Sequence, residues 1–278
     1  MTPKTAVLPV ALASGVVMSG LTAPALRMAL VLLSELSPTG GIDMLKPRLE
    51  KLAGVRLDNA ERALNRLRDA RFERGDDAPF VFDELNYTPG SMKRLAGVIA
   101  GRLSPSFFES IADPSWGGKT VQVDLDELRQ LSTVPGILLW LRLAIERQSG
   151  TDQFRLRMRG EDIAPIFGPY LSRATISRKT AADGQFMWTS LSRMFTSIVA
   201  PAISDLHAVL PDHVVDATPI TKVGAGKGVP WLAIDVEMNR ISRRPSLREM
   251  AKRSRERDEY ELRKRKPTDP HHTAVEEG

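Results

Sequence analysis

The sequence predicts an α+β fold, predominantly helical, in which two domains of the same layout are followed by a basic tail. Two observations lead to this prediction. Residues 184–237 read as a long amphipathic helix followed by a two-stranded hairpin, and the first half of the chain repeats this order of elements without residue-level identity. A helix followed by a β-ribbon is typical of a winged-helix module. We therefore expect two tandem winged-helix domains, at residues 1–124 and 125–238, and a basic, flexible tail at residues 239–278.

The bulk composition is that of an ordinary folded protein. The chain has 278 residues, enough for two domains, and 42% of them are hydrophobic. It contains no cysteine, which excludes disulfides, zinc–cysteine sites and thiol chemistry. This composition fits a reducing compartment, and we expect a cytoplasmic protein.

The N-terminus allows two interpretations. Residues 6–21 are apolar, and Ala23-Pro24-Ala25 resembles a signal-peptidase site. The apolar run is too short, and too interrupted by Pro9 and two glycines, to span a membrane. Because Thr22 suits the N-cap of a following helix, we expect the run to pack beneath that helix, with a signal peptide as the alternative.

The first domain is predicted from apolar periodicity and turn residues. Apolar residues three or four apart predict buried helix stripes at Leu26, Leu30 and Leu33 and again at Ala60, Leu64 and Leu67. Glycine and proline mark turns and helix starts. The predicted elements are a helix from Thr22 to about Leu36, a turn at 37–41, a strand at 42–45, a helix from Pro47 to about Gly54, a helix capped by Asp58, a strand at 80–85, a helix at 92–103 and a strand at 119–123.

The second domain begins with a strongly apolar helix at residues 138–147. Residues 154–158 alternate apolar and basic side chains, as a half-exposed strand does. A short helix is expected at 161–167, and residues 170–184 are polar and irregular. The long helix and the hairpin follow.

The long helix has two different faces. The apolar face is most simply a core stripe, formed by Leu191, Met194, Phe195, Ile198, Ala202, Leu206 and Val209. The other face carries Trp188, Thr189, Ser192, Arg193 and Thr196. Small hydroxyl side chains let a backbone approach a DNA groove, and an arginine can fork onto guanine or phosphate. Pro201 should kink the helix or end its regular part, so base reading is expected before it.

The hairpin is predicted at residues 214–223 and 229–236, with a glycine-rich tip at 224–228. Pro219 lacks an N–H donor, so its strand should lie at a sheet edge. Lys222 and Lys227 near the tip suit a wing that follows the phosphate backbone.

Charge is concentrated near the C-terminus. The formal charge is +5, yet residues 239–266 hold 12 lysines and arginines against 5 acidic residues, and the rest of the chain nets −2. This segment is either a solvated mixed-charge tail or an arm that adds phosphate contacts.

The sequence gives little support for nucleotide binding, metal binding or catalysis. The run Gly224-Ala-Gly-Lys-Gly lacks the spacing and the following helix of a phosphate-binding loop. Asp126 and Glu127 suit a helix start, and His207 and His213 have no spaced partner for a metal. No triad or other catalytic constellation assembles. We expect a binding protein that is not an enzyme and needs neither cofactor nor metal.

Several runs of the sequence resemble one known family. They are residues 101–111 (GRLSPSFFESI), 121–132 (VQVDLDELRQLS) with the leucine-rich helix after them, 195–206, and the hairpin ending in Ala233-Ile-Asp-Val. These runs are similar to the plasmid replication initiators that bind iterons, the direct repeats at a plasmid origin, through two winged-helix domains. The similarity covers residues 8–237 in order and spacing and consists of apolar patterns.

The resemblance implies a function. Such a protein binds double-stranded DNA at direct repeats as a monomer, with the main base contacts from the second-domain helix at 188–200. The first domain would contact DNA near Asn59, Arg62 and Arg66, or serve as a dimer surface. Bound initiators distort adjacent A·T-rich DNA and recruit the host replication initiator and the replicative helicase, while dimers act as repressors or link origins.

The sequence departs from the family in its basic residues, and it leaves two alternative functions open. The reading face here carries only Arg193, and basic residues cluster upstream at Arg173, Arg178 and Lys179, so phosphate contacts could come from there. The alternatives are a winged-helix transcription regulator without a replication role, and an exported or scaffold protein without a DNA role.

Overall fold

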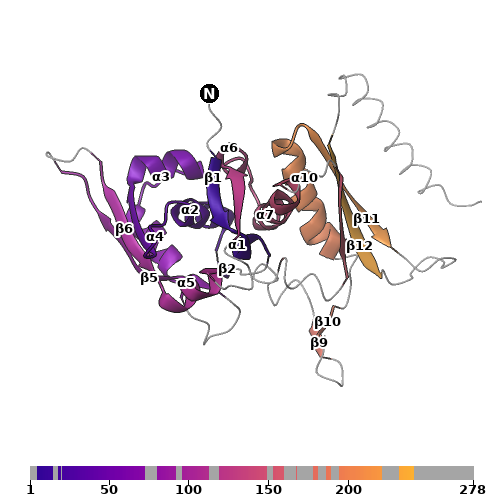
Figure 1. The fold of residues 1–278 in the computed structure, drawn as a ribbon, viewed down its shortest axis with the longest axis horizontal. Coiled ribbons are helices and arrows are strands. Elements are labelled where there is room, and N and C mark those ends of the chain that lie inside the picture. The colour runs from indigo at the N-terminus through magenta and orange to yellow at the C-terminus, as the bar shows by residue number, and fades with distance from the viewer. Residues whose placement is uncertain are drawn as a thin grey trace, which may run out of the picture. The chain divides into compact units, whose positions relative to one another are not determined.

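The computed structural model describes most of the first 240 residues. The described residues are 5–14, 18–19, 21–72, 80–91, 96–112, 119–148, 153–159, 167, 178–180, 186–188, 194–220 and 232–240. Met1–Arg240 forms one compact unit, whose elements are drawn in Figure 1. The expected boundary between residues 124 and 125 stays a prediction. Of the predicted tail only Asn239 and Arg240 are described, and they end the last strand.

Residues 23–103, which we call the first module, form a helix, a strand, two helices and a hairpin. These elements are α2 (Ala23–Leu33), β3 (Gly41–Leu45), α3 (Lys46–Ala53), α4 (Ala60–Arg68), β5 (Phe82–Thr88) and β6 (Val98–Leu103). The three strands form an antiparallel sheet in the order β3-β6-β5. Two short strands, β2 (Met18–Ser19) and β4 (Arg71–Phe72), also pair.

Local chemistry sets the ends of these helices. Proline occupies the first turn of both α2 and α3, where its missing N–H leaves no hydrogen bond unmade. α3 ends at Gly54, whose φ of +62° lies in the left-handed region that favours glycine. The cap of α4 is Asn59 rather than the predicted Asp58, because Asn59 Oδ1 accepts a hydrogen bond from the Arg62 backbone N–H at 2.9 Å.

The helix predicted at residues 92–103 is wrong where the chain is described, since Val98–Leu103 is the strand β6. Ile99 and Leu103 are buried while Ala100 and Arg102 are exposed, which is the alternation of a strand. A side chain at Gly101 would collide with the Glu84 carbonyl on β5. The first hairpin is therefore β5–β6. The helix α5 (Pro105–Ala112), which we did not predict, follows directly.

The N-terminal apolar run packs into the core, as expected. β1 (Thr5–Pro9) pairs antiparallel with β7 (Thr120–Asp124), and α1 (Val10–Ser14) contacts α7 (Val134–Gln148). Leu8 and Ala11 are fully buried. No helix within the described residues is long and apolar enough to cross a membrane.

Residues 134–240, which we call the second module, repeat the layout of the first. After α6 (Leu125–Leu128) they contain α7, β8 (Gln153–Met158), the π-helical turn η2 (Phe195–Val199), α10 (Ala200–Val209), β11 (His213–Ile220) and β12 (Ala233–Arg240). The sheet order β11-β12-β8 matches β5-β6-β3 of the first module. In each module the helix before the hairpin contacts the first hairpin strand, α4 on β5 and α10 on β11.

Two predictions for this module can be compared directly with the structure. Pro219 lies on β11, which pairs only with β12 among the described strands, so the predicted edge position is confirmed. The strand predicted at residues 154–158 is β8, with alternating burial. Of the helix predicted at 161–167 only Phe167 is described, and it is buried.

The core runs through both modules. α7 contacts α1 and α2 on one side and α10 on the other, as Figure 1 shows for α1 and α10. Trp140 and Leu139 on α7 are buried. The described chain thus mixes helix and strand as an α+β fold does, with more strand than the predicted predominance of helix implied.

Candidate nucleic-acid interface

The first candidate surface is the outer face of α4. Leu64 and Leu67 point into the core and fix the rotation of the helix. The opposite side then presents Arg62, Asn65 and Arg66, which are all exposed. Positions 62 and 66 are one helical turn apart, so both guanidinium groups lie on one face.

Among the residues that the structure describes, no side chain neutralises Arg62 or Arg66. Within the described residues, the guanidinium groups of both make no ion pair and no hydrogen bond. Arg68, by contrast, donates from Nη2 to Asn65 Oδ1 at 3.1 Å and to the Leu85 carbonyl at 3.1 Å, which ties α4 to β5. Two unpaired arginines on an exposed helix face can accept phosphates without first breaking a protein contact.

Asn59 has a structural role at the same helix. Its side-chain oxygen caps α4, so it holds the first turn that carries Arg62. Its predicted contact with DNA stays a prediction.

The described part of the predicted long helix begins at Met194. Ile198 and Val199 are buried, while Thr196 and Ser197 are exposed, so the predicted face at Thr196 is turned outward. The Ala200 N–H bonds the Phe195 carbonyl five residues earlier, and α10 starts there with Pro201 in its first turn. Pro201 thus marks a change from π to α geometry, which confirms the predicted interruption.

The start of the predicted long helix is wrong. Phe186–Trp188 is a strand, β10, and pairs antiparallel with β9 (Arg178–Thr180). Aromatic residues favour strands, and pairing with β9 outweighs the helical pattern read from the sequence. Trp188 therefore lies on a strand opposite Arg178, and Lys179 lies on β9 rather than in an irregular segment.

The remaining predicted contacts lie outside the described residues. They are Arg173, Thr189, Ser192, Arg193, Lys222 and Lys227.

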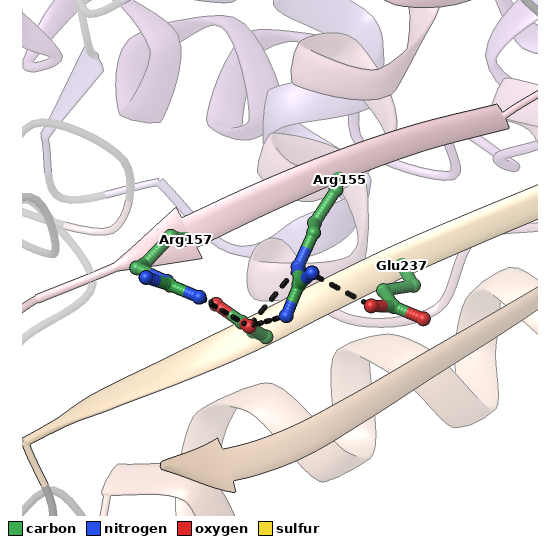
Figure 2. A network of polar contacts seen from close by, with 4 residues as sticks. Arg155, Arg157 and Glu237 are labelled. Carbon is green, nitrogen blue, oxygen red and sulfur yellow. Dashed lines mark hydrogen bonds and ion pairs between the residues drawn. The ribbon is translucent and has the colours of Figure 1, made fainter.

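A polar network on the second sheet was not predicted. Figure 2 shows Arg155 and Arg157 of β8 converging on a carboxylate of β12, with Glu237 beside it. Arg157 Nε donates to Asp235 Oδ1 at 2.8 Å, Arg155 Nε donates to Asp235 Oδ2 at 3.1 Å, and Arg155 also pairs with Glu237 at 3.2 Å. The hydrogen bond from Arg157 is the main cause that lowers the pKa of Asp235, against the opposing effect of burial. The sequence does contain an indication of this network, because arginines alternate along β8 and acidic residues alternate along β12.

The net charge of this network differs from that of the α4 face. The two arginines are matched by Asp235 and Glu237, so the sheet face carries little net charge and its cations are already occupied. A matched network holds β8 to β12, whereas unmatched arginines attract anions. Of these two surfaces, the α4 face is therefore the better candidate for binding an anion.

The two modules share one order of helix and hairpin and one strand order, and this layout is also found in a solved structure. The solved structure "Crystal structure of Pi initiator protein in complex with iteron DNA" matches 87% of this chain and 100% of its own chain, with a TM-score of 0.56 and 15% sequence identity. At this identity the match shows a shared fold, and it confirms at that level the resemblance read from the sequence. No family model matches the sequence. No curated protein matches it either.

Proposed function

We propose that this protein binds double-stranded DNA sequence-specifically at the direct repeats of a plasmid origin and initiates replication there. The observation that carries the proposal is the fold match, because it extends over the whole chain of an initiator protein that was solved in complex with iteron DNA. Arg62 and Arg66 on α4, which have no partner in the described part of the chain, supply a physical means of binding phosphates.

In this proposal each module is a winged helix. The order helix, strand, helix, helix and hairpin in the first module, and the matching strand orders β5-β6-β3 and β11-β12-β8, support it. α4 and the helix at residues 194–209, which we call the reading helix, would face the DNA. The hairpins would be the wings.

The proposed roles of individual residues follow from their chemistry. Arg62 and Arg66 contact phosphates, and Arg193 reads a base just before the reading helix, where Thr196 is turned outward. Arg178 and Lys179 on β9, together with Lys222 and Lys227 near the second wing, add phosphate contacts.

The wider role is also part of the proposal. The protein acts by binding, without catalysis, in the cytoplasm, where it distorts A·T-rich DNA beside the repeats and recruits the host initiator and helicase. A dimeric form acts as a repressor. In this scheme the free energy gained from phosphate and base contacts exceeds the free-energy cost of bending the DNA, and this difference drives the deformation.

Footprinting on the DNA that flanks the gene tests the proposal. The expected result is protection of several direct repeats of one sequence at regular spacing. Protection of one palindrome would instead support a transcription regulator, since palindromes mirror two-fold symmetric dimers. Uniform protection at all protein concentrations would contradict specific binding altogether.

A further inference from the structure

A buried carboxylate joins the reading helix to α7. Asp205 on α10 is only 9% exposed, and it lies at the first turn of α7. It accepts hydrogen bonds from the Ser132 N–H at 2.9 Å, the Ser132 hydroxyl at 2.8 Å, the Thr133 N–H at 2.9 Å and the Thr133 hydroxyl at 3.0 Å. Ser132 and Thr133 directly precede α7, and the dipole of a helix favours a negative charge at its N-terminal end. A single side chain thus fixes α10 against the start of α7.

The backbone of α7 is shaped for this contact. A side chain at Gly136 would collide with Asp205 Oδ2 and would come within 2.8 Å of the Thr133 hydroxyl. Glycine at this position therefore allows the carboxylate to reach both residues.

The first module contacts the segment that precedes α7 through Arg27 on α2. Its Nη1 donates to the carbonyl of Arg129, three residues before Ser132, while its buried Nε has no hydrogen-bond partner among the described residues. Burial lowers the pKa of Arg27, and the negative charge of Asp205 opposes this effect. A half-buried guanidinium with an unsatisfied N–H is costly, and a nearby carboxylate offsets part of that cost.

We propose that Arg27, Asp205 and the segment 129–133 between them form a latch that sets the orientation of the reading helix relative to the first module. α10 continues directly from η2, so any rotation of α10 moves the outward face at Thr196. On the other side, α2 contacts α4, which carries Arg62 and Arg66. The latch therefore links the two surfaces that, under the proposed function, contact DNA.

The consequence for DNA rests on the proposed function. Two binding surfaces on one molecule gain affinity from each other only when their separation matches the spacing of their sites, and a linkage of this kind is worth roughly 100-fold or more. Arg27 and Asp205 are thus positioning residues for the reading of a repeat, although neither touches DNA.

A distance measurement tests the latch without DNA. The chain contains no cysteine, so Glu61→Cys on α4 and Asp216→Cys on β11 introduce one exposed thiol in each module for spin labels. The otherwise unaltered chain is expected to give one narrow distribution of inter-label distances. Arg27→Met and Asp205→Asn should each broaden or shift it, whereas the exposed controls Arg56→Met and Asp43→Asn should leave it unchanged.

Arg27→Met separates orientation from stability, because it leaves the hydrogen bonds from Ser132 and Thr133 to Asp205 in place. A thermal melt of each variant accompanies the distance measurement. Narrow, unshifted distributions in both Arg27→Met and Asp205→Asn would overturn the latch.

A binding measurement then tests the positioning role, with unlabelled protein and a duplex holding one footprinted repeat. The comparison duplex has five base pairs inserted at the centre of the repeat, about half a helical turn. Arg27→Met is expected to bind the native repeat about tenfold more weakly and to lose most of its preference over the inserted duplex. An unchanged preference would overturn the positioning role. If the unaltered protein binds no duplex specifically, the proposed function fails, and the distance measurement still decides the latch.

Discussion

Arg62 and Arg66 differ from most arginines of the described chain in having no carboxylate or carbonyl partner. Each phosphate contact made by such a cation releases condensed counterions from DNA, which makes binding salt-dependent. The double variant Arg62→Ala/Arg66→Ala should weaken binding to all duplexes. It should also reduce the slope of log Kobs against log salt by about 2, or roughly 0.9 per contact. A fluorescence-anisotropy salt titration measures this slope.

Arg56→Ala is the matched control for this experiment. Arg56 is an exposed arginine paired with Asp58 just before α4, and its loss removes one positive charge where the double variant removes two. A slope reduced by Arg56→Ala half as much as by the double variant would show that net charge, and not the α4 face, determines binding.

Asp235 gives the second sheet a pH-dependent stability. Its folded-state pKa is lowered mainly by the hydrogen bond from Arg157, so its stabilising effect is complete above the unfolded-state pKa of about 3.9. As the pH falls below about 4, the unfolded state takes up the proton first, and stability falls until the folded carboxyl is protonated as well. Asp235→Asn should remove this dependence and cost about 1 kcal/mol at pH 7, a value for a solvent-screened network. Urea unfolding at pH 7, 4 and 3 measures both effects, and an unchanged pH dependence in the variant would contradict them.

At the scale of elements, close approach of β5 and β6 depends on Gly101. Any side chain there would collide with the Glu84 carbonyl at the β-bulge between Phe82 and Glu84. Gly101→Ala should therefore destabilise the fold by about 1–3 kcal/mol. Ala100→Val, on the exposed side of the same strand, should change stability by less than about 0.5 kcal/mol. Thermal unfolding compares the two, and equal effects would show that crowding at Gly101 is not the cause.

The same strand shows where sequence reading succeeds and where it does not. Local signals located α2, α3, α4, α7, β8 and the second hairpin, because proline starts, glycine ends and apolar stripes act within a few residues. The sequence pattern predicts helix at Val98–Leu103 and Phe186–Trp188, since nothing local reveals that β5 and β9 lie beside them. Strand pairing is a long-range contact and outweighs local propensity.

The candidate site, like the fold, could be predicted from the sequence only in part. The outward position of Arg62 and Arg66 followed from the stripe of Leu64 and Leu67. That these two arginines are unpaired, while Arg155 and Arg157 are paired with Asp235, depends on contacts between distant parts of the chain. Those contacts could not be read from the sequence.

At the scale of the whole molecule, the basic tail is expected to act on DNA in a sequence-independent way. β12 runs to Arg240, so a truncation that spares the sheet must begin at residue 241. Removing residues 241–278 should weaken binding to repeat and random duplexes by the same factor and flatten the salt dependence. Competition binding at two salt concentrations measures this, and a loss confined to the repeat duplex would assign base reading to the tail.

The most direct measurement is the ratio of affinities for a duplex with one footprinted repeat and for a scrambled duplex of equal length and composition, at physiological salt. A specific DNA-binding protein typically prefers its site by 10³-fold or more, and we predict a ratio of at least about 10³ for this chain. Equal affinities for the two duplexes would contradict the proposal that this protein reads DNA repeats.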